Sequence, residues 1–142
     1  MAALTPYRHA SSYLTQLTIF VSDRNKALLG TYTLKGSYTS TTNCPVSGYR
    51  WIREGTVLAH DGTYVYPNPS GNAAGNEVGV LEDRVLYPTE LGDDYNPICT
   101  VVLDYAWLNE QVLTDGGTFG TVQANTRTNL GGRIRFVAGY RV

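Results

Sequence analysis

Short runs in which apolar and polar residues alternate recur along the chain, separated by stretches rich in glycine, proline, serine and threonine. This pattern is typical of half-buried β-strands, because successive side chains of a strand point to opposite faces. The runs that predict strands are residues 17–21, 28–34, 49–52, 55–59, 63–66, 77–81, 98–103, 118–124 and 133–137.

Two pairs of these runs predict hairpins. Residues 17–21 and 28–34 flank a polar turn, and 55–59 and 63–66 flank the turn signal Asp61-Gly62. The most apolar run, 98–103, predicts a central strand.

One segment, residues 104–113, predicts a helix instead. Asp104 is a suitable N-cap, Asp115-Gly116-Gly117 would end the helix, and Trp107, Leu108, Gln111 and Val112 fall near one helical face. With no internal repeat or domain boundary in sight, we expect an all-β or β-rich α+β fold. It would be a single compact β domain over residues 16–142, with one short helix near 104–113.

Residues 1–15 carry no clear period and predict an extended N-terminal arm. Its spaced apolar residues are Leu4, Pro6, Tyr7, Tyr13 and Leu14. Two interpretations stay open: a frayed terminus, or an arm that becomes ordered on a partner.

Composition narrows the possible partners. Hydrophobic residues make up 42% of the chain and charged residues 16%, with 15 Gly, 11 Tyr and a net charge of −1. Because no basic stripe could neutralise phosphates, we expect no nucleic-acid partner. No apolar run approaches the roughly 18 residues of a membrane span, and no signal-peptide stretch opens the chain, so we expect a protein made in the cytoplasm.

Candidate catalytic groups are few. His60 precedes the Asp61-Gly62 turn and His9 lies in the arm, so neither is placed to act as a base. The carboxylate pairs Glu82/Asp83 and Asp93/Asp94 are interpreted as solvated loop charges. The sequence therefore predicts no catalytic residue, cofactor, metal or small-molecule substrate.

The cysteines and tyrosines are interpreted structurally. Cys44 and Cys99 fit no zinc or redox spacing and are expected to be free thiols; a disulfide between them stays open. The tyrosines lack interleaved basic residues and are expected in the core and at protein interfaces.

Several short pieces in the middle of the chain occur in a distinctive order. They are Gly55-Thr56-Val57-Leu58, Asp61-Gly62-Thr63-Tyr64, Val78-Gly79-Val80-Leu81-Glu82-Asp83, Val101-Val102-Leu103 and Leu108 to Leu113. In this order, over about residues 53–113, the chain resembles the head-decoration family of tailed phages, which includes the decoration protein of phage lambda. The residues that carry the pattern are Gly55, Val57, Leu58, Asp61, Gly62, Gly79, Val80 and Leu81.

The resemblance implies a structural protein without enzymatic activity. Members of such a family bind the outside of an expanded phage head as homotrimers and stabilise the shell. They contact the major capsid protein, with the N-terminal arm adding to one of its strands. The expected location is therefore the outer surface of the virion.

Two other function classes stay open. A phage tail, baseplate or receptor-binding β module would share the composition. A small hydrolase or sugar-binding enzyme would depend on His60, Glu82 or Asp83.

Overall fold

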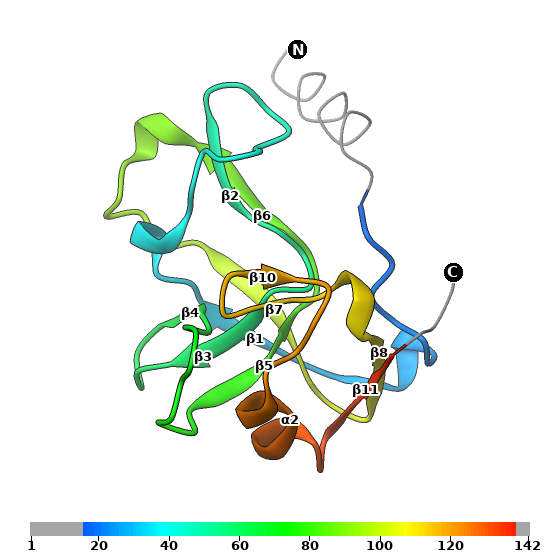
Figure 1. The fold of residues 1–142 in the computed structure, drawn as a ribbon. Helices are drawn as coiled ribbons and strands as arrows, with labels where there is room; N and C mark the ends of the chain where they lie inside the picture. Colours follow the sequence, from blue (N-terminus) through cyan, green and yellow to red (C-terminus); the bar gives the residue numbers. More distant parts are fainter. Residues whose placement is uncertain (1–15, 139–142) are drawn as a thin grey trace.

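Five strands that are far apart in the chain form the main sheet of the protein. The computed structural model describes residues 16–138. The strands lie in the order β1 (Leu28–Thr33), β7 (Ile98–Asp104), β5 (Glu77–Leu81), β3 (Val57–His60) and β4 (Val65–Pro67), with each neighbouring pair antiparallel (Figure 1). A parallel bridge between Leu34 and Val65 joins the two edges of this sheet at one end. The β-rich fold and the interior position of residues 98–103 are thereby confirmed.

Smaller elements surround this sheet. Two antiparallel ribbons pair β2 (Tyr49–Ile52) with β6 (Val85–Pro88), and β9 (Thr114–Asp115) with β10 (Thr118–Phe119). A parallel ribbon pairs β8 (Ala106–Asn109) with β11 (Ile134–Val137). Within residues 16–138 the helical elements are α2 (Ala124–Leu130) and four 3₁₀ turns, η1 (Arg24–Lys26), η2 (Gly36–Tyr38), η3 (Thr89–Leu91) and η4 (Glu110–Val112).

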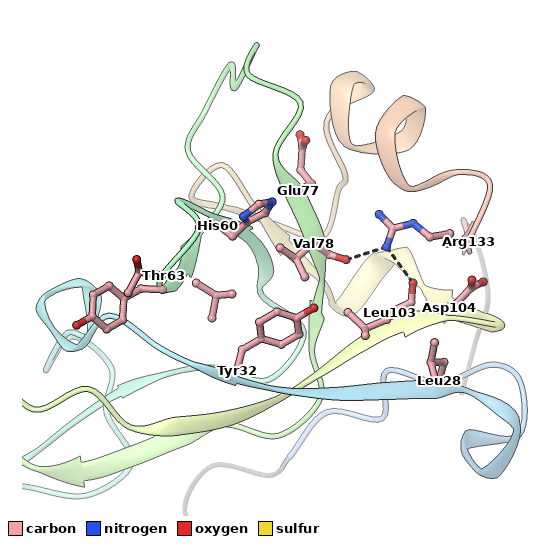
Figure 2. Close-up of a pocket in the computed structure, with 12 residues that line it drawn as sticks. Leu28, Tyr32, His60, Thr63, Glu77, Val78, Leu103, Asp104 and Arg133 are labelled. Atoms are coloured by element: carbon pink, nitrogen blue, oxygen red, sulfur yellow. Dashed lines mark hydrogen bonds between the residues drawn. The ribbon is translucent and has the colours of Figure 1, made fainter.

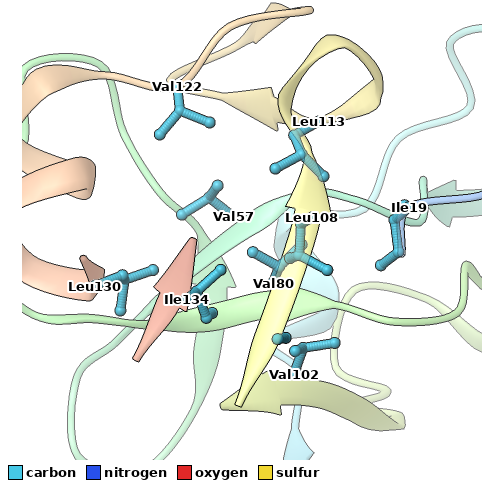
Figure 3. Packing of buried hydrophobic residues seen from close by; sticks show 10 residues of the cluster. Ile19, Val57, Val80, Val102, Leu108, Leu113, Val122, Leu130 and Ile134 are labelled. Atoms are coloured by element: carbon cyan, nitrogen blue, oxygen red, sulfur yellow. The ribbon is translucent and has the colours of Figure 1, made fainter. Parts of the chain in front are cut away.

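Strand β5 separates two hydrophobic clusters and is buried along its whole length. Figure 3 shows the first cluster, in which Val80 and Val102 meet side chains from β8, α2 and β11. The second cluster lies around Leu58, Leu81 and Val101. Because both faces are covered, β5 is apolar throughout except at its first residue.

A register shift explains how β5 contributes side chains to both hydrophobic clusters. Leu58 pairs with Gly79 but Ala59 pairs with Glu77, so β5 carries one residue more than β3 at this point. A bulge of this kind reverses the alternation of side chains. As a result Val78 joins the same cluster as Leu81, while Glu77 reaches Asn129 of α2 on the other side.

The prediction of a helix over residues 104–113 is wrong. Tyr105 has a φ of 57°, a left-handed conformation that ends β7, and the chain then continues as β8 and η4. Residues 106–109 also fit a strand, because Ala106 and Leu108 are buried while Trp107 is exposed. The pairing of β8 with β11, and of Trp107 and Asn109 with residues 19–22, decides for the strand.

Three other sequence predictions need correction. Residues 17–21 form no strand and no hairpin with β1; they cross β8 through one antiparallel bridge, Phe20 with Leu108. Only Thr118–Phe119 of the predicted strand 118–124 is extended in a ribbon, and α2 follows it. Strand β6 lies outside every run that predicts a strand, so the sequence pattern missed it.

The remaining strand predictions are confirmed within one or two residues, including the hairpin of β3 and β4. The predicted arm, residues 1–15 with Leu4, Pro6, Tyr7, Tyr13 and Leu14, lies outside the described residues.

A buried ion pair holds the β2–β6 ribbon to the start of the described chain. Arg84 donates to both carboxylate oxygens of Glu54, at 3.1 and 2.9 Å, and both side chains are at least 97% buried. The Leu17 amide donates to the same carboxylate at 2.7 Å. Arg84 also lies 5.4 Å from the ring centre of Trp51.

Replacing Gly79 with alanine is expected to destabilise the fold strongly. An added Cβ would lie 2.0 Å from the carbonyl oxygen of Val102, so β5 and β7 would have to separate. The free energy of unfolding should fall by about 3 kcal/mol or more, measured by urea denaturation. Gly132→Ala is the matched control, because nothing lies within 4 Å of its added Cβ; equal stability of the two variants would contradict the packing argument.

Breaking the buried ion pair is a second test. Arg84→Met leaves the Glu54 carboxylate buried without its counter-charge and should lower the free energy of unfolding by about 3–5 kcal/mol. Asp93→Asn removes the partner of Arg50, but the Asp93 side chain is 72% exposed, so its effect should stay below about 1 kcal/mol. A small effect of Arg84→Met would show that the charges are not held as described.

Candidate functional site

A cleft of about 420 Å³ lies between the two edges of the main sheet. Figure 2 shows its apolar lining, to which β1 contributes Leu28 and Tyr32, β5 contributes Val78, and β7 contributes Leu103. The β3–β4 turn closes one side. At that end the amide of Lys35 donates to the carbonyl of Val65 at 2.9 Å, so the cleft opens where β1 and β4 diverge.

Three charged residues and a histidine surround this apolar lining: Glu77, Asp104, Arg133 and His60. Arg133 Nη1 donates to the carbonyl oxygens of Val78 and Leu103, at 3.2 and 3.3 Å (Figure 2). Its guanidinium therefore ties β5 to β7. Glu77 is buried, accepts from Asn129 Nδ2 at 2.9 Å, and has no hydrogen-bond partner at Oε2 among the described residues.

The residues of the hydrolase interpretation do not come together. His60 is exposed at the end of β3 beside the start of β5, where its amide donates to Asn76. Glu82 and Asp83 follow the other end of β5, about 20 Å away at a rise of about 3.3 Å per residue. A site built from these three side chains is therefore not formed.

The prediction that Glu82 is a solvated loop charge is wrong. Glu82 is buried and pairs with Arg24, whose side chain is half exposed. Asp83, Asp93 and Asp94 are exposed as expected.

Neither a metal site nor a membrane helix is found in residues 16–138. No group of three or more His, Cys, Asp or Glu side chains is placed to hold a metal ion within that range. None of its helices has the length and apolar character that crossing a membrane requires.

Three pieces of the family resemblance lie on neighbouring strands of the main sheet, β3, β5 and β7, whereas Leu108 to Leu113 lies in β8 and η4 outside it. Val57 pairs with Val80, Leu58 with Gly79, and Val80 with Val102. Gly55 precedes β3 with a φ of 84°, and an added Cβ would lie 2.9 Å from the carbonyl oxygen of Val112. These residues therefore have structural roles.

The Asp61-Gly62 turn is built as the sequence indicates. Asp61 Oδ1 accepts from the amides of Thr63 and Tyr64, each at 2.9 Å, and Gly62 has a φ of 97°. The hydrogen bonds from the Tyr64 and Thr63 amides hold the pKa of Asp61 below its usual value.

A group of exposed aromatic and cationic side chains lies next to the cleft, and sequence reasoning missed it. Tyr105 is 71% exposed and Trp107 50% exposed, with the Arg135 guanidinium 4.8 Å from the centre of the Trp107 indole. Asp104 lines both the cleft and the hollow that Tyr105, Trp107 and Arg135 share, and its strand partner Leu28, which is half exposed, lines the cleft. We call Leu28, Tyr105, Trp107 and Arg135 the aromatic patch. Its only signal in the sequence was the alternation of residues 105–108, which was interpreted as helical.

Both cysteines are free thiols, as predicted. Cys44 is half-buried and Cys99 is buried in β7. Burial raises the pKa of Cys44 above its ordinary value and that of Cys99 to about 11.

Cys99 is therefore expected to resist alkylation. With iodoacetamide near pH 8, Cys44 should be modified well before Cys99 in the folded protein, as followed by peptide mass spectrometry. Modification of Cys99 as fast as Cys44 would contradict its burial; urea-unfolded protein is the control, in which both should react alike.

The same pKa shift predicts a pH dependence of stability. Because folding favours the neutral Cys99 thiol, the contribution of this thiol to the free energy of unfolding should be complete below its ordinary pKa of 9.0 and decline as the pH rises through about 11.

Comparison with known proteins identifies no relative, since the chain matches no protein-family model, no curated protein and no solved structure.

Proposed function

We propose that this protein is a non-enzymatic capsid decoration protein, which binds the outside of an expanded phage head as a homotrimer and stabilises the shell. The observation that carries the proposal is the aromatic patch. Exposed Tyr, Trp and Arg side chains grouped on a rigid sheet are the residues that most often contribute binding energy at protein interfaces.

The positions of the patch residues are those expected of a protein-binding surface. Tyr105 and Trp107 lie on either side of the buried residue Ala106, and Leu108 anchors the same strand in the core. Their backbone is thus fixed while their side chains stay outside. A rigid aromatic surface loses little conformational entropy when it binds.

The family resemblance indicates which kind of protein the patch would bind. Three of its pieces lie on β3, β5 and β7, the strands that form the middle of the sheet. The major capsid protein is the proposed partner, and the virion surface the proposed location.

The proposed mechanism is thermodynamic linkage. A protein that binds the expanded shell, and not its precursor, stabilises the expanded state by its binding free energy at every site. No covalent bond is made or broken. The N-terminal segment, residues 1–15, would provide reach by adding to a strand of the capsid protein.

The proposal predicts that the purified protein co-sediments with expanded, undecorated shells of its source phage. Binding should saturate at a fixed number of copies per shell and raise the temperature at which shells disrupt. Deleting residues 1–14 should abolish this binding. The domain should keep its circular-dichroism spectrum and melting temperature, because the deletion ends before Leu17, whose amide binds Glu54.

Unexpanded shells are the control and should bind little. No binding at high protein concentration would overturn the decoration role and favour a tail, baseplate or receptor-binding module. If the deletion unfolds the domain, residues 1–14 belong to the core and the arm hypothesis is wrong.

A further inference from the structure

A second cleft, of about 300 Å³, lies between the end of β2 and the β9–β10 hairpin. Figure 1 shows this hairpin beside the base of the β2–β6 ribbon. The cleft is lined by Trp51 and Arg53 on one side and by Phe119 with the turn residues Gly116 and Gly117 on the other. Both glycines have a positive φ, as a two-residue hairpin turn requires, so this wall is set by the backbone.

Arg53 lies between two aromatic rings in this cleft. Its guanidinium carbon is 6.0 Å from the centre of the Trp51 ring and 5.5 Å from that of Phe119. Trp51 is fixed by its indole N–H, which donates to the carbonyl of Thr42 at 2.8 Å. Both rings lie within about 6 Å, the range in which a guanidinium and an aromatic face attract each other, and Arg53 is half-buried.

The Arg53 side chain lacks an acidic partner within residues 16–138. None of the four ion pairs there includes it, and its buried Nε has no hydrogen-bond acceptor. The neighbouring Glu54 is occupied by Arg84 and the Leu17 amide. Asp115, beside the glycine turn, accepts from Asn68 and Gln123.

The charge of the cleft is therefore one-sided. Its lining residues include one cation, Arg53, and no carboxylate. A guanidinium offers a planar fork of donors that matches a carboxylate. Aromatic side chains that exclude water strengthen such a pair, since charges interact more strongly where water is scarce.

From this geometry we infer that the cleft between β2 and the β9–β10 hairpin binds a carboxylate, carried by an Asp or Glu side chain of a partner protein. The carboxylate would bind the Arg53 guanidinium, and its carbon chain would lie against Phe119. The identity of the carrier, a partner protein, rests on the proposed function. The binding of a carboxylate by Arg53 does not depend on it.

The chemistry is tested with two capped peptides that differ in charge alone, acetyl-Gly-Glu-Gly-amide and acetyl-Gly-Gln-Gly-amide. In ¹⁵N NMR titrations at constant ionic strength, the Glu peptide should shift the Arg53 Nε–H signal and the Gly116 and Gly117 amides in a saturable way. The Gln peptide should not. Arg53→Gln should weaken binding of the Glu peptide about tenfold or more, and Arg53→Lys should weaken it less.

Lys35→Gln is the matched control, because it removes another cation that lies over an aromatic ring, that of Tyr64, but is outside this cleft and outside the aromatic patch. It should leave the peptide shifts unchanged. Circular dichroism of each variant verifies that the fold is intact. The inference is overturned if both peptides shift the signals equally, if neither gives a saturable shift, or if folded Arg53→Gln binds the Glu peptide as the wild type does.

Co-sedimentation of Arg53→Gln with expanded shells then tests the carrier. Weaker sedimentation than wild type would support an acidic side chain of the shell as the ligand. If the wild type binds the Glu peptide but not the shell, the proposed function fails and the carboxylate site stands. If it binds the shell but not the peptide, the site fails and the function stands.

Discussion

The close approach of β5 to β7 is the constraint on which the other packing depends. Gly79 leaves no room for a side chain against the Val102 carbonyl, and Val80 and Leu81 are completely buried. Because β5 is covered on both faces, one strand connects the cluster under α2 and β11 with the cluster under the β2–β6 ribbon. The bulge opposite Leu58 then divides its side chains between the two. A substitution in β5 would therefore disturb the packing of both hydrophobic clusters.

Buried polar groups attach the C-terminal third of the domain to this sheet. Asn68, which follows β4, donates to Asp115 at 2.9 Å and to the Thr126 hydroxyl at 3.1 Å. Asp115 also accepts from the backbone and side chain of Gln123. One carboxylate thus joins the β9–β10 hairpin to the residue that precedes α2. A fully satisfied network of this kind favours one arrangement of its members, because any other would leave a buried polar group unpaired.

Charged and aromatic groups are distributed differently between interior and surface. The buried carboxylates of Glu54, Glu82 and Glu110 each have an arginine partner. The aromatic patch, by contrast, exposes Tyr105 and Trp107, and the half-buried Arg53 has no acidic partner among the described residues. Such groups gain when a second surface covers them, since exposed apolar area is buried and an unpaired cation can meet a counter-charge. Both features therefore favour a role in binding another protein.

The sequence by itself determined the β-rich class, most strands and the β3–β4 hairpin, because alternation and the Asp61-Gly62 turn are local signals. It also indicated the free cysteines. Only the tertiary structure decided between strand and helix for residues 106–109, whose pattern fits both until β11 pairs beside them. Likewise α2 has weak helix formers and is held by Thr126 and Leu130, which are buried against the sheet. The Arg53 cleft joins residues distant in the chain; no local pattern encodes such a contact, because folding alone brings the two segments together.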